Sequence, residues 1–335
     1  MRAMVLREHA LLHENPTPLI LSDVPVPRPG HGEVLVRVAA CGVCHTELDE
    51  IEGRLRPPSL PRIVGHEIVG IVVEHGSATT HCTTGTRVGV GWIHHADGSP
   101  HENLSPAFSS TGCDVDGGYA EYIAVPEDYV YPIPDIYEDA EAAPLLCAGA
   151  IGYRALRLTM LKNGQHLGLT GFGGSAHLVL QLARYQFPDS HVYVFARDAE
   201  VRRFAEHLGA VWTGNTDQKP PVLLDAIIDT TPAWRPVVKA LGCLRPGGRL
   251  VINAIRKEAG DQSELLALSY HDHLWMEKEI KTVANITQYD IRAFLPLAAA
   301  IPIRPTVETY PLEEANRALT ELRAGKIRGA KVLVP

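Results

Sequence analysis

The chain has 335 residues, of which 45% are hydrophobic and 21% charged, and this predicts a globular protein of about two domains. Its net charge of −8 provides no attraction for nucleic acid or an anionic membrane, and no apolar run reaches the ~20 residues of a membrane-spanning helix. Glu8, His9, His13 and Glu14 stand where a signal peptide would be apolar, so we expect a cytoplasmic protein with neither nucleic acid nor membrane as a partner.

The first 135 residues have the pattern of a β-rich region. Apolar or alternating runs separated by glycine and proline predict strands within residues 33–43, 63–76, 86–92 and 119–125. From about residue 150 the pattern changes to alternating strands and helices. This alternation predicts an α/β region with a parallel sheet covered on both faces.

The segment 199–210 has the apolar spacing of a helix. Val201, Phe204, Ala205 and Leu208 fall on one helical face, which we expect to pack against the sheet. The C-terminal tail predicts one more helix, ending near a glycine, and then a last strand.

The stretch AACGVCHTELDE, residues 39–50, contains two overlapping cysteine motifs. C-x-x-C-H is typical of c-type haem attachment, whereas C-x-x-C alone is also typical of half a zinc site or of a redox pair. Haem attachment takes place outside the cytosol, which the expected location disfavours. Among the six cysteines of a large intracellular chain, metal ligands or isolated buried thiols are expected rather than a disulfide framework.

A glycine-rich turn lies between the first strand and the first helix of the α/β region. Residues 171–176, Gly171-Phe172-Gly173-Gly174-Ser175-Ala176, form a G-x-G-x-x-A motif. Glycine allows a tight turn and close approach of backbone N–H groups to a pyrophosphate, and the small last residue lets the helix pack closely on the strand. Within a strand–turn–helix unit this motif predicts dinucleotide binding, and the alternative is a merely tight turn.

The end of the next strand carries Ala196 and Arg197, where NAD-binding domains usually have an acidic residue for the ribose 2′-hydroxyl. A small residue followed by a guanidinium suits a 2′-phosphate, which favours NADP(H) over NAD(H). Two alternatives stay open: Arg197 is simply solvated, or Asp198 is the acid, displaced by two positions.

Cys44, His66 and Cys147 are a candidate set of metal ligands. Three widely spaced protein ligands of this type leave a fourth zinc position open for water or substrate, and two thiolates offset the charge of the ion. Taken one at a time, each of these residues could have a purely structural role, since an isolated buried cysteine usually contributes only to packing. We assign that structural role to Cys41, although it lies near enough to Cys44 to be an oxidation partner, and also to Cys82, Cys113 and Cys243.

Six motifs together resemble the zinc-dependent alcohol dehydrogenases of the medium-chain dehydrogenase/reductase superfamily. They are GVCHTE, GHEIVGIVVEHG, DVDGGYAEY, LLCAGAIGY, TGFGGSA and KIRGAKVL, and they occur in the family's order along the chain. The resemblance implies a GroES-like catalytic domain, residues 1–145 completed by 290–335, and an inserted Rossmann NAD(P)-binding domain, residues 146–289.

The resemblance also implies a role for residues around the metal. Cys44, His66 and Cys147 match the zinc ligands, Glu67 matches a glutamate that transiently approaches the metal, and Glu47 matches an acid that orients the histidine ligand.

Further matches concern substrate and cofactor. Thr46 matches the hydroxyl that takes the substrate proton, and His45 and Arg328 match contacts to the cofactor pyrophosphate. Trp92 matches a bulky pocket residue that favours small or slender primary alcohols and aldehydes, the alternative being an ordinary core tryptophan.

The chain departs from the family pattern in two places. Relatives commonly have a histidine that ends the proton relay five residues after the catalytic cysteine, and here that position is Asp49. The four-cysteine lobe that binds a structural zinc in many relatives is replaced by WIHHADGSPHENLS, which contains no cysteine. We therefore expect one zinc per chain.

The shortened lobe does contain four possible substitute ligands, His94, His95, Asp97 and His101, although a polar surface loop is the favoured interpretation. The lobe often supports subunit contacts in relatives, and here it is shortened. The expectation of a homo-oligomer, a dimer or tetramer, therefore rests on the family resemblance alone.

The sequence thus predicts an NAD(P)-dependent zinc alcohol dehydrogenase or aldehyde reductase for a small alcohol or aldehyde. A zinc-free quinone or enone reductase is the nearest alternative but lacks the Cys/His/Cys set. A non-catalytic NAD(P)-binding redox sensor is the alternative from another class.

Overall fold

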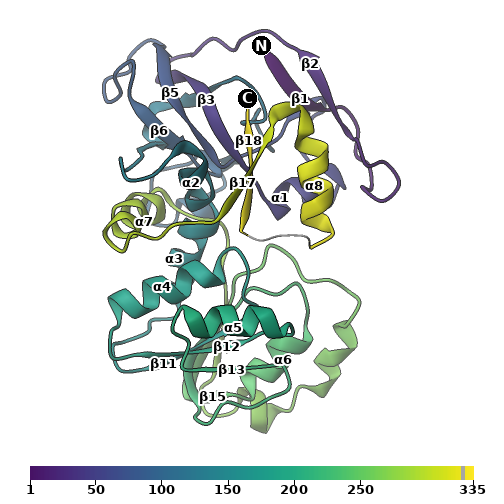
Figure 1. Ribbon diagram of the computed structural model, residues 1–335, viewed down its shortest axis with the longest axis vertical. Helices are drawn as coiled ribbons and strands as arrows, with labels where there is room; N and C mark the ends of the chain where they lie inside the picture. The colour runs from purple at the N-terminus through teal and green to yellow at the C-terminus, as the bar shows by residue number, and fades with distance from the viewer. Residues whose placement is uncertain (326–328) are drawn as a thin grey trace. The chain divides into compact units, whose positions relative to one another are not determined.

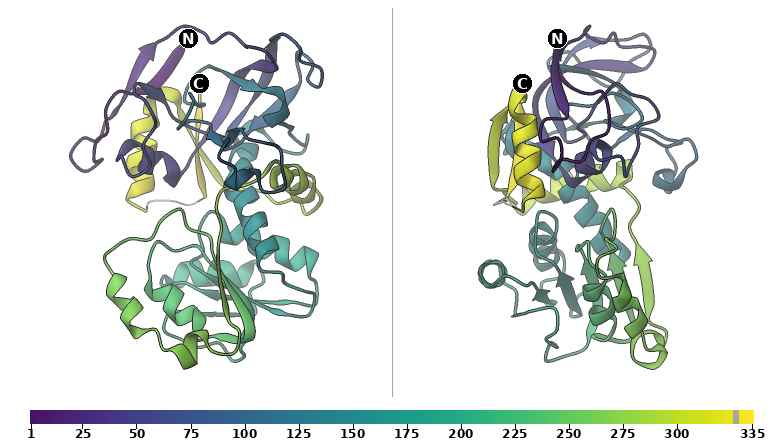
Figure 2. Two further views of the ribbon diagram at one scale, coloured as in Figure 1. Left: turned by 180° about the vertical axis from the view of Figure 1, so that it is seen from behind. Right: turned by 90° about the vertical axis from the view of Figure 1, so that its right-hand side faces the viewer.

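The computed structural model describes residues 1–325 and 329–335, whose contacts divide the chain into two units. The first unit combines residues 1–150 with 285–335, and the second comprises residues 151–284 (Figures 1 and 2). The domain limits expected from the sequence each lie five residues away from these limits.

The first unit is built around a sheet of seven strands, with β3 at its centre. Six of the strands follow the order β10-β6-β5-β3-β18-β17, and β9 also pairs with β3. The strands are β3 (Glu33–Val43), β5 (Ile68–His75), β6 (Arg87–Val90), β9 (Tyr122–Pro126), β10 (Val130–Pro132), β17 (Val307–Pro311) and β18 (Ala330–Val334). The strand nearest the C-terminus, β18, is therefore an internal strand of this sheet, antiparallel to β3 with Leu333 opposite Cys41.

Smaller elements surround this sheet. The further strands are β1 (Arg2–Leu6), β2 (Leu19–Asp23), β4 (Arg62–Ile63), β7 (Ile93–His95) and β8 (Ser109–Ser110). The α-helices are α1 (His45–Ile51), α2 (Asp139–Ala142), α7 (Gln288–Ala300) and α8 (Ala315–Arg323), and the short 3₁₀ turns are η1 (Glu102–Leu104), η2 (Glu127–Tyr129), η3 (Ala143–Leu146) and η6 (Leu312–Glu314). α8 packs on β3, β17 and β18, while η3 packs on β3, β5 and β6.

The second unit contains a six-stranded parallel sheet in the order β13-β12-β11-β14-β15-β16. Its strands are β11 (His166–Thr170), β12 (His191–Phe195), β13 (Trp212–Gly214), β14 (Leu224–Asp229), β15 (Leu244–Ile252) and β16 (Glu279–Thr282). Its helices are α3 (Ala148–Leu158), which begins in the first unit, α4 (Ala176–Gln186), α5 (Ala199–His207), α6 (Arg235–Leu241), and the shorter η4 (Gln262–Ala267) and η5 (Tyr270–Leu274). The α/β prediction is confirmed.

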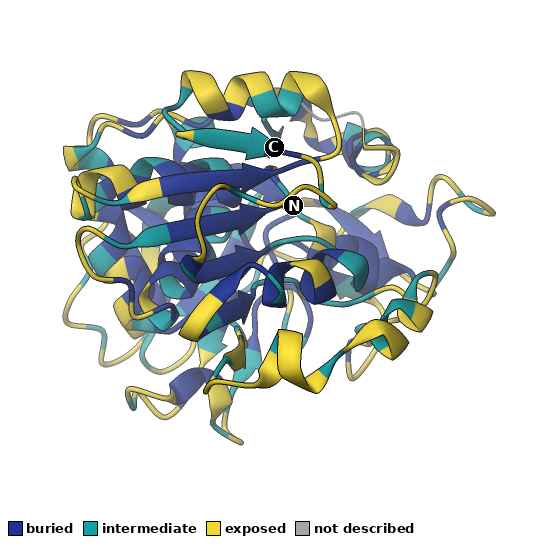
Figure 3. Ribbon diagram, turned by 90° about the horizontal axis from the view of Figure 1, so that it is seen from below, coloured by how far each residue is buried: buried dark blue, intermediate teal, exposed yellow. Residues whose placement is uncertain are grey.

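Burial is concentrated in the central strands of the sheets and on the helix faces that pack against them. The strands nearest the middle of each sheet are dark blue in Figure 3, whereas the outer faces of the helices are exposed. In β11 and β14, for example, Leu167, Leu169, Ile227 and Ile228 are fully buried, because a parallel strand covered on both faces needs apolar side chains on both. No helix in the described part of the chain is long and apolar enough to cross a membrane.

One expectation about α5 is wrong. The helix forms as predicted, and Ala205 is fully buried, but Phe204 is 47% exposed. Its ring instead lies edge-on to Phe172, at 5.9 Å between centroids, and at a tilt to His177 of α4. The other three residues of the stripe, Val201, Ala205 and Leu208, are buried or half-buried, so only Phe204 lies at the edge of the packed face.

Candidate metal centre and cofactor-binding turn

Four potential metal ligands gather in the first unit. The ligand atoms of Cys44, His66, Glu67 and Cys147 all lie within 4.8 Å of one another. They form the only group of three or more such side chains found among residues 1–325 and 329–335. The structure thus brings together the three predicted ligands and the predicted neighbouring glutamate.

The pairing of β3 with β5 accounts for two of these positions. Cys41 lies opposite Ile68, and the Gly42 N–H donates to the Glu67 carbonyl at 2.9 Å, so the end of β3 and the start of β5 are adjacent. Cys44, directly after β3, and His66, two residues before β5, consequently face one site.

Two glycines make this close approach possible. A Cβ on Gly42 would overlap the Glu67 carboxylate. Gly65 has a φ of +102°, and a Cβ there would overlap the ring of Tyr119. Any larger residue at either position would displace the ligand-bearing segment.

Cys147 reaches the site from a third segment. It follows the η3 turn and directly precedes α3. Leu146 of η3 packs closely on the sheet at Gly89, which has no side chain, and a Cβ at that position would collide with it. Three segments far apart in sequence therefore supply one ligand each.

Glu47 connects two of the ligands. Its Oε1 lies 2.6 Å from His66 Nδ1, and its Oε2 accepts from the Cys44 N–H at 2.8 Å. Burial alone would lower the pKa of His66, but the Glu47 carboxylate holds this pKa well above its ordinary value. With Nδ1 directed at Glu47, the buried Nε2 of His66 has no hydrogen-bond partner in the described structure.

The chemistry of this set fits a divalent metal that accepts sulfur and nitrogen. A hydrogen bond from the Cys147 thiol, with further help from His66, lowers the pKa of Cys44 well below its ordinary value, which favours the thiolate that binds metal. A carboxylate on the far nitrogen of a ligating histidine is the usual arrangement at zinc, since it fixes the tautomer and the ring orientation.

The next residues of α1 follow the ligand. His45 is exposed, whereas Thr46 is buried, with Oγ1 3.6 Å from Cys44 Sγ. Asp49 is 4% exposed and its Oδ1 accepts from Arg54 Nε at 2.6 Å. The predicted relay role of Asp49 stays a prediction, and its pairing with Arg54 is a feature that the sequence analysis missed.

Glu50 is a further buried acid near the ligands that was not predicted from the sequence. This residue is fully buried, and neither carboxylate oxygen has a hydrogen-bond partner in the described structure. Burial, followed by the charge of Glu47, raises the pKa of Glu50 well above its ordinary value. Position i+3 from Glu47 on one helix was the available signal, because such residues share a helix face.

Trp92 lies beside the ligands. Its ring is edge-on to His66 at 4.8 Å between centroids, and its Nε1 is buried without a hydrogen-bond partner among the residues described. The tryptophan is 9% exposed, so both predicted roles, pocket wall and core residue, are compatible with its position.

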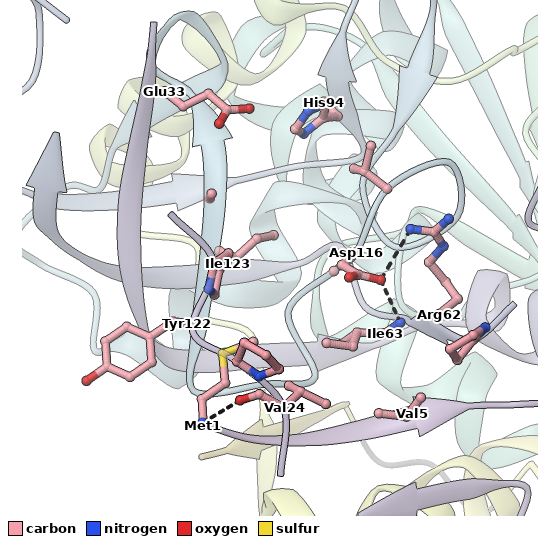
Figure 4. Close-up of a pocket in the computed structure, with 16 residues that line it drawn as sticks. Met1, Val5, Val24, Glu33, Arg62, Ile63, His94, Asp116, Tyr122 and Ile123 are labelled. Atoms are coloured by element: carbon pink, nitrogen blue, oxygen red, sulfur yellow. Dashed lines mark hydrogen bonds and ion pairs between the residues drawn. The ribbon is translucent and has the colours of Figure 1, made fainter. Parts of the chain in front are cut away.

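The four possible substitute ligands of the shortened lobe do not gather into a metal-binding group within the described residues. His94 instead lines a cavity of about 340 Å³ together with Glu33, Arg62 and Asp116 (Figure 4). None of the four gathered ligands borders this cavity.

The glycine turn lies in the second unit, at the carboxyl end of β11. Gly171 has a φ of +76°, and a Cβ there would crowd the side chains of Thr230 and Thr231. A Cβ on Gly173 or Gly174 would meet no atom within 4 Å. The turn therefore leaves open space in front of its second and third glycines, directly before α4, as the predicted pyrophosphate site requires.

The wall of this turn contains a buried ion pair that the sequence analysis missed. Asp229, at the end of β14, is fully buried and accepts from Thr170 Oγ1 at 2.6 Å and Thr231 Oγ1 at 2.8 Å. Lys257 pairs with the same carboxylate and donates to the Thr231 carbonyl at 2.7 Å. These contacts fix the strand ends that flank Gly171.

The end of β12 carries the predicted cofactor-selecting residues. Ala196 is buried and Arg197 is exposed. Asp198 Oδ1 accepts from the N–H groups of Glu200 and Val201, at 2.7 and 3.2 Å, and so caps α5. Arg328, the remaining predicted cofactor contact, lies outside the described residues.

Known proteins resemble the chain along nearly its whole length. Residues 30–135 match the alcohol dehydrogenase GroES-like domain family. A probable alcohol dehydrogenase, AdhA, of Mycobacterium tuberculosis is 44% identical over 321 residues, which cover 92% of this chain and 90% of the relative. An alcohol dehydrogenase of Geobacillus stearothermophilus is 34% identical over 339 residues, which cover 97% of this chain and 98% of the relative.

Solved structures agree with these relatives. The alcohol dehydrogenase of Aeropyrum pernix superposes with a TM-score of 0.86 at 26% identity, covering 100% of both chains. AibC superposes with a TM-score of 0.89 at 27% identity, covering 100% of this chain and 96% of the other. With two relatives above 30% identity over almost the full length, the chain belongs to the alcohol dehydrogenases of the medium-chain dehydrogenase/reductase superfamily and is an NAD(P)-dependent alcohol dehydrogenase.

Proposed function

We propose that this alcohol dehydrogenase uses one zinc ion per chain, held by Cys44, His66 and Cys147. The observation that carries the proposal is the buried, unpartnered Nε2 of His66, which lies with two cysteine sulfurs inside a 4.8 Å cluster. A buried polar nitrogen without a partner is costly unless a ligand satisfies it. Glu67 is a fourth member that can approach the ion.

The zinc, when bound, supplies a Lewis acid that polarises a carbonyl or lowers the pKa of an alcohol. The chain supplies the remaining functions. Glu47 holds His66 in one orientation through Nδ1, and Thr46 Oγ1, next to Cys44, accepts the hydroxyl proton of the substrate. Trp92, packed on His66, limits the space for the substrate, which favours small or slender primary alcohols and aldehydes.

We further propose that NADP(H) is preferred over NAD(H). Ala196 stands where an acid would bind the ribose 2′-hydroxyl, and Arg197 follows it. Asp198 is a poor substitute for that acid, because its carboxylate already caps α5. The absence of a second zinc remains part of the proposal, and the cysteine-free lobe supports it.

The enzyme is also proposed to be a homo-oligomer. β16 is an edge strand of the parallel sheet, and all four of its residues are exposed, including Ile280 at 46%. Trp275 and Met276 just before it are 48% and 52% exposed. An exposed edge strand is a template for pairing with another chain, and here Ile280 and the two residues before the strand supply apolar surface beside it.

The test combines metal analysis with kinetics. The purified protein is expected to contain one zinc per chain and to reduce small aldehydes with NADPH. Cys147→Ser should lose the zinc and at least about 100-fold in kcat/KM, because one of three ligands is gone. Cys82→Ser, which changes a cysteine outside the ligand set, is the control and should retain both the zinc and the kcat/KM of the unmodified enzyme. Two zinc ions per chain, or full zinc occupancy in Cys147→Ser, would contradict the proposal.

A further inference from the structure

Arg202 lies at the end of the first turn of α5, and its side chain extends back toward the strand that precedes the helix. Its backbone N–H donates to the Asp198 carbonyl at 3.2 Å, as in a regular first turn. Its side-chain Nη1 donates to the carbonyls of Ala196 at 2.7 Å and Arg197 at 2.8 Å. The guanidinium is therefore fixed against the backbone of the two residues that are proposed to select the cofactor.

Arg202 is not compensated by an acid. Within the described residues, neither Arg197 nor Arg202 has a carboxylate in ion-pair distance. The neighbouring Arg203, in contrast, pairs with Glu200. With Asp198 committed to the N–H groups of α5, the carboxyl end of β12 carries two positive charges without acidic partners.

Two such charges suit an anion of more than one charge. Guanidinium groups bind phosphate through charge-assisted hydrogen bonds, and a guanidinium that is already immobilised loses less conformational entropy on binding. Arg202 Nη1 is occupied by the two carbonyls, whereas its Nε and Nη2 have no protein partner among the described contacts. Arg197 is exposed and has no comparable anchor on its side chain.

We propose that Arg202 is a second determinant of NADP(H) selectivity, acting as a positioning residue for the 2′-phosphate. It holds the Ala196–Arg197 backbone in place, so that Arg197 faces the ribose, and it adds its own charge to that of Arg197. The ligand class is a 2′-phosphorylated adenosine. This inference rests on the proposed NADP(H) preference and assigns part of it to a residue outside the strand-end motif.

The experiment compares 2′,5′-ADP with 5′-ADP as probes of the zinc-loaded enzyme by calorimetry, since the two differ only in the 2′-phosphate. Arg202→Met keeps an aliphatic side chain but removes the positive charge and the hydrogen bonds to the carbonyls of Ala196 and Arg197. It should weaken 2′,5′-ADP binding about 10-fold and leave 5′-ADP binding within about two-fold. Arg202→Lys, which keeps the charge, should recover part of the loss. Arg203→Met removes a neighbouring arginine that is already paired and should change neither.

The outcomes separate the inference from the cofactor proposal. If the unmodified enzyme binds 2′,5′-ADP no better than 5′-ADP, the NADP(H) preference itself is wrong, and the inference falls with it. If the unmodified enzyme prefers 2′,5′-ADP but Arg202→Met retains that preference, only the inference is wrong. Equal weakening of both probes in a variant that unfolds at the normal temperature would also contradict it, because it would indicate a general effect on the nucleotide site.

Discussion

Around His66, three neighbouring carboxylates are buried in different roles. Glu47 bonds the imidazole, Glu67 joins the ligand cluster, and Glu50 has no protein partner. A buried carboxylate without hydrogen bonds favours its neutral form, because burial penalises the charge and no donor compensates for it. The resulting free-energy cost is expected to increase with pH.

Glu50→Gln should therefore raise stability at neutral and alkaline pH. In the folded state the pKa of Glu50 is raised, so its stabilising contribution is complete below the unfolded pKa of about 4.3 and is lost as pH rises toward the folded value. Gln has no proton to release. The variant should unfold like the parent near pH 4 and be more stable by about 1–3 kcal/mol at pH 8, by urea denaturation.

The exposed Glu74→Gln on β5 is the matched control, and it should show no such trend. A difference between Glu50→Gln and the parent that is constant across pH would show that the proton on Glu50 is not the cause.

A residue's role could be predicted from the sequence where it depends on the residue type and its neighbours in the chain, and not where it depends on contacts in the folded structure. Cys44, His66 and Cys147 could be proposed because sulfur and imidazole are uncommon side chains with few roles, and their segments carry recognisable flanks. Glu50 and Arg202 look in sequence like solvated charges on helices. Their significance depends on burial and on carbonyl partners, which no spacing rule reveals.

At the scale of elements, a carboxylate anchors the shortened lobe to a helix. Glu102, in η1, is 2% exposed, and its Oε2 accepts from Gln288 Nε2 at 3.2 Å and from the Tyr129 hydroxyl at 3.4 Å. Its Oε1 accepts from the Gln288 backbone N–H, which is otherwise an unsatisfied donor at the start of α7. One side chain thus ties three segments together in a lobe that has no cysteine.

Glu102→Ala should lower the free energy of unfolding by about 1–3 kcal/mol, because it removes the acceptor of the buried Tyr129 hydroxyl and of two part-buried Gln288 donors. Zinc content should stay at one per chain, since Glu102 is not in the ligand cluster. Chemical denaturation and metal analysis on the same sample check both statements. Loss of the zinc together with the stability would contradict the assignment of a purely supporting role.

Elements were predictable where their periodicity is strong. The strand–helix alternation after residue 150 predicts the parallel sheet, and α5 forms within the predicted segment. Of the predicted apolar stripe of α5 only Phe204 is exposed, because its ring has partners in Phe172 and His177, which belong to other elements. Helical periodicity identifies a face but not which neighbour that face meets.

On the scale of the whole molecule, the exposed edge of the second unit is the strongest candidate for contact between copies. The apolar residues before and within β16 lie next to unpaired backbone N–H and C=O groups of an edge strand. A second copy that pairs with this edge would bury both. The sequence could only suggest an oligomer through the family, because an edge strand is defined by its place in the sheet.

Ile280→Lys should therefore shift the enzyme toward the monomer, since a charged side chain on an edge strand opposes strand pairing. Size-exclusion chromatography with light scattering at several concentrations measures the mass. Ile255→Lys, at a residue that is 58% exposed outside β16, is the control and should leave the assembly unchanged. An unchanged mass for Ile280→Lys would exclude the β16 edge as the contact.

The position of β18 has a consequence for how the enzyme is made. β3, which precedes Cys44, pairs with β18 along Cys41–Val43, and β18 follows the whole second unit in the chain. On the ribosome, every residue of the second unit emerges before this partner strand does. We expect the second unit to be able to fold before β18 is made, and the metal centre to mature only after β18 has paired with β3.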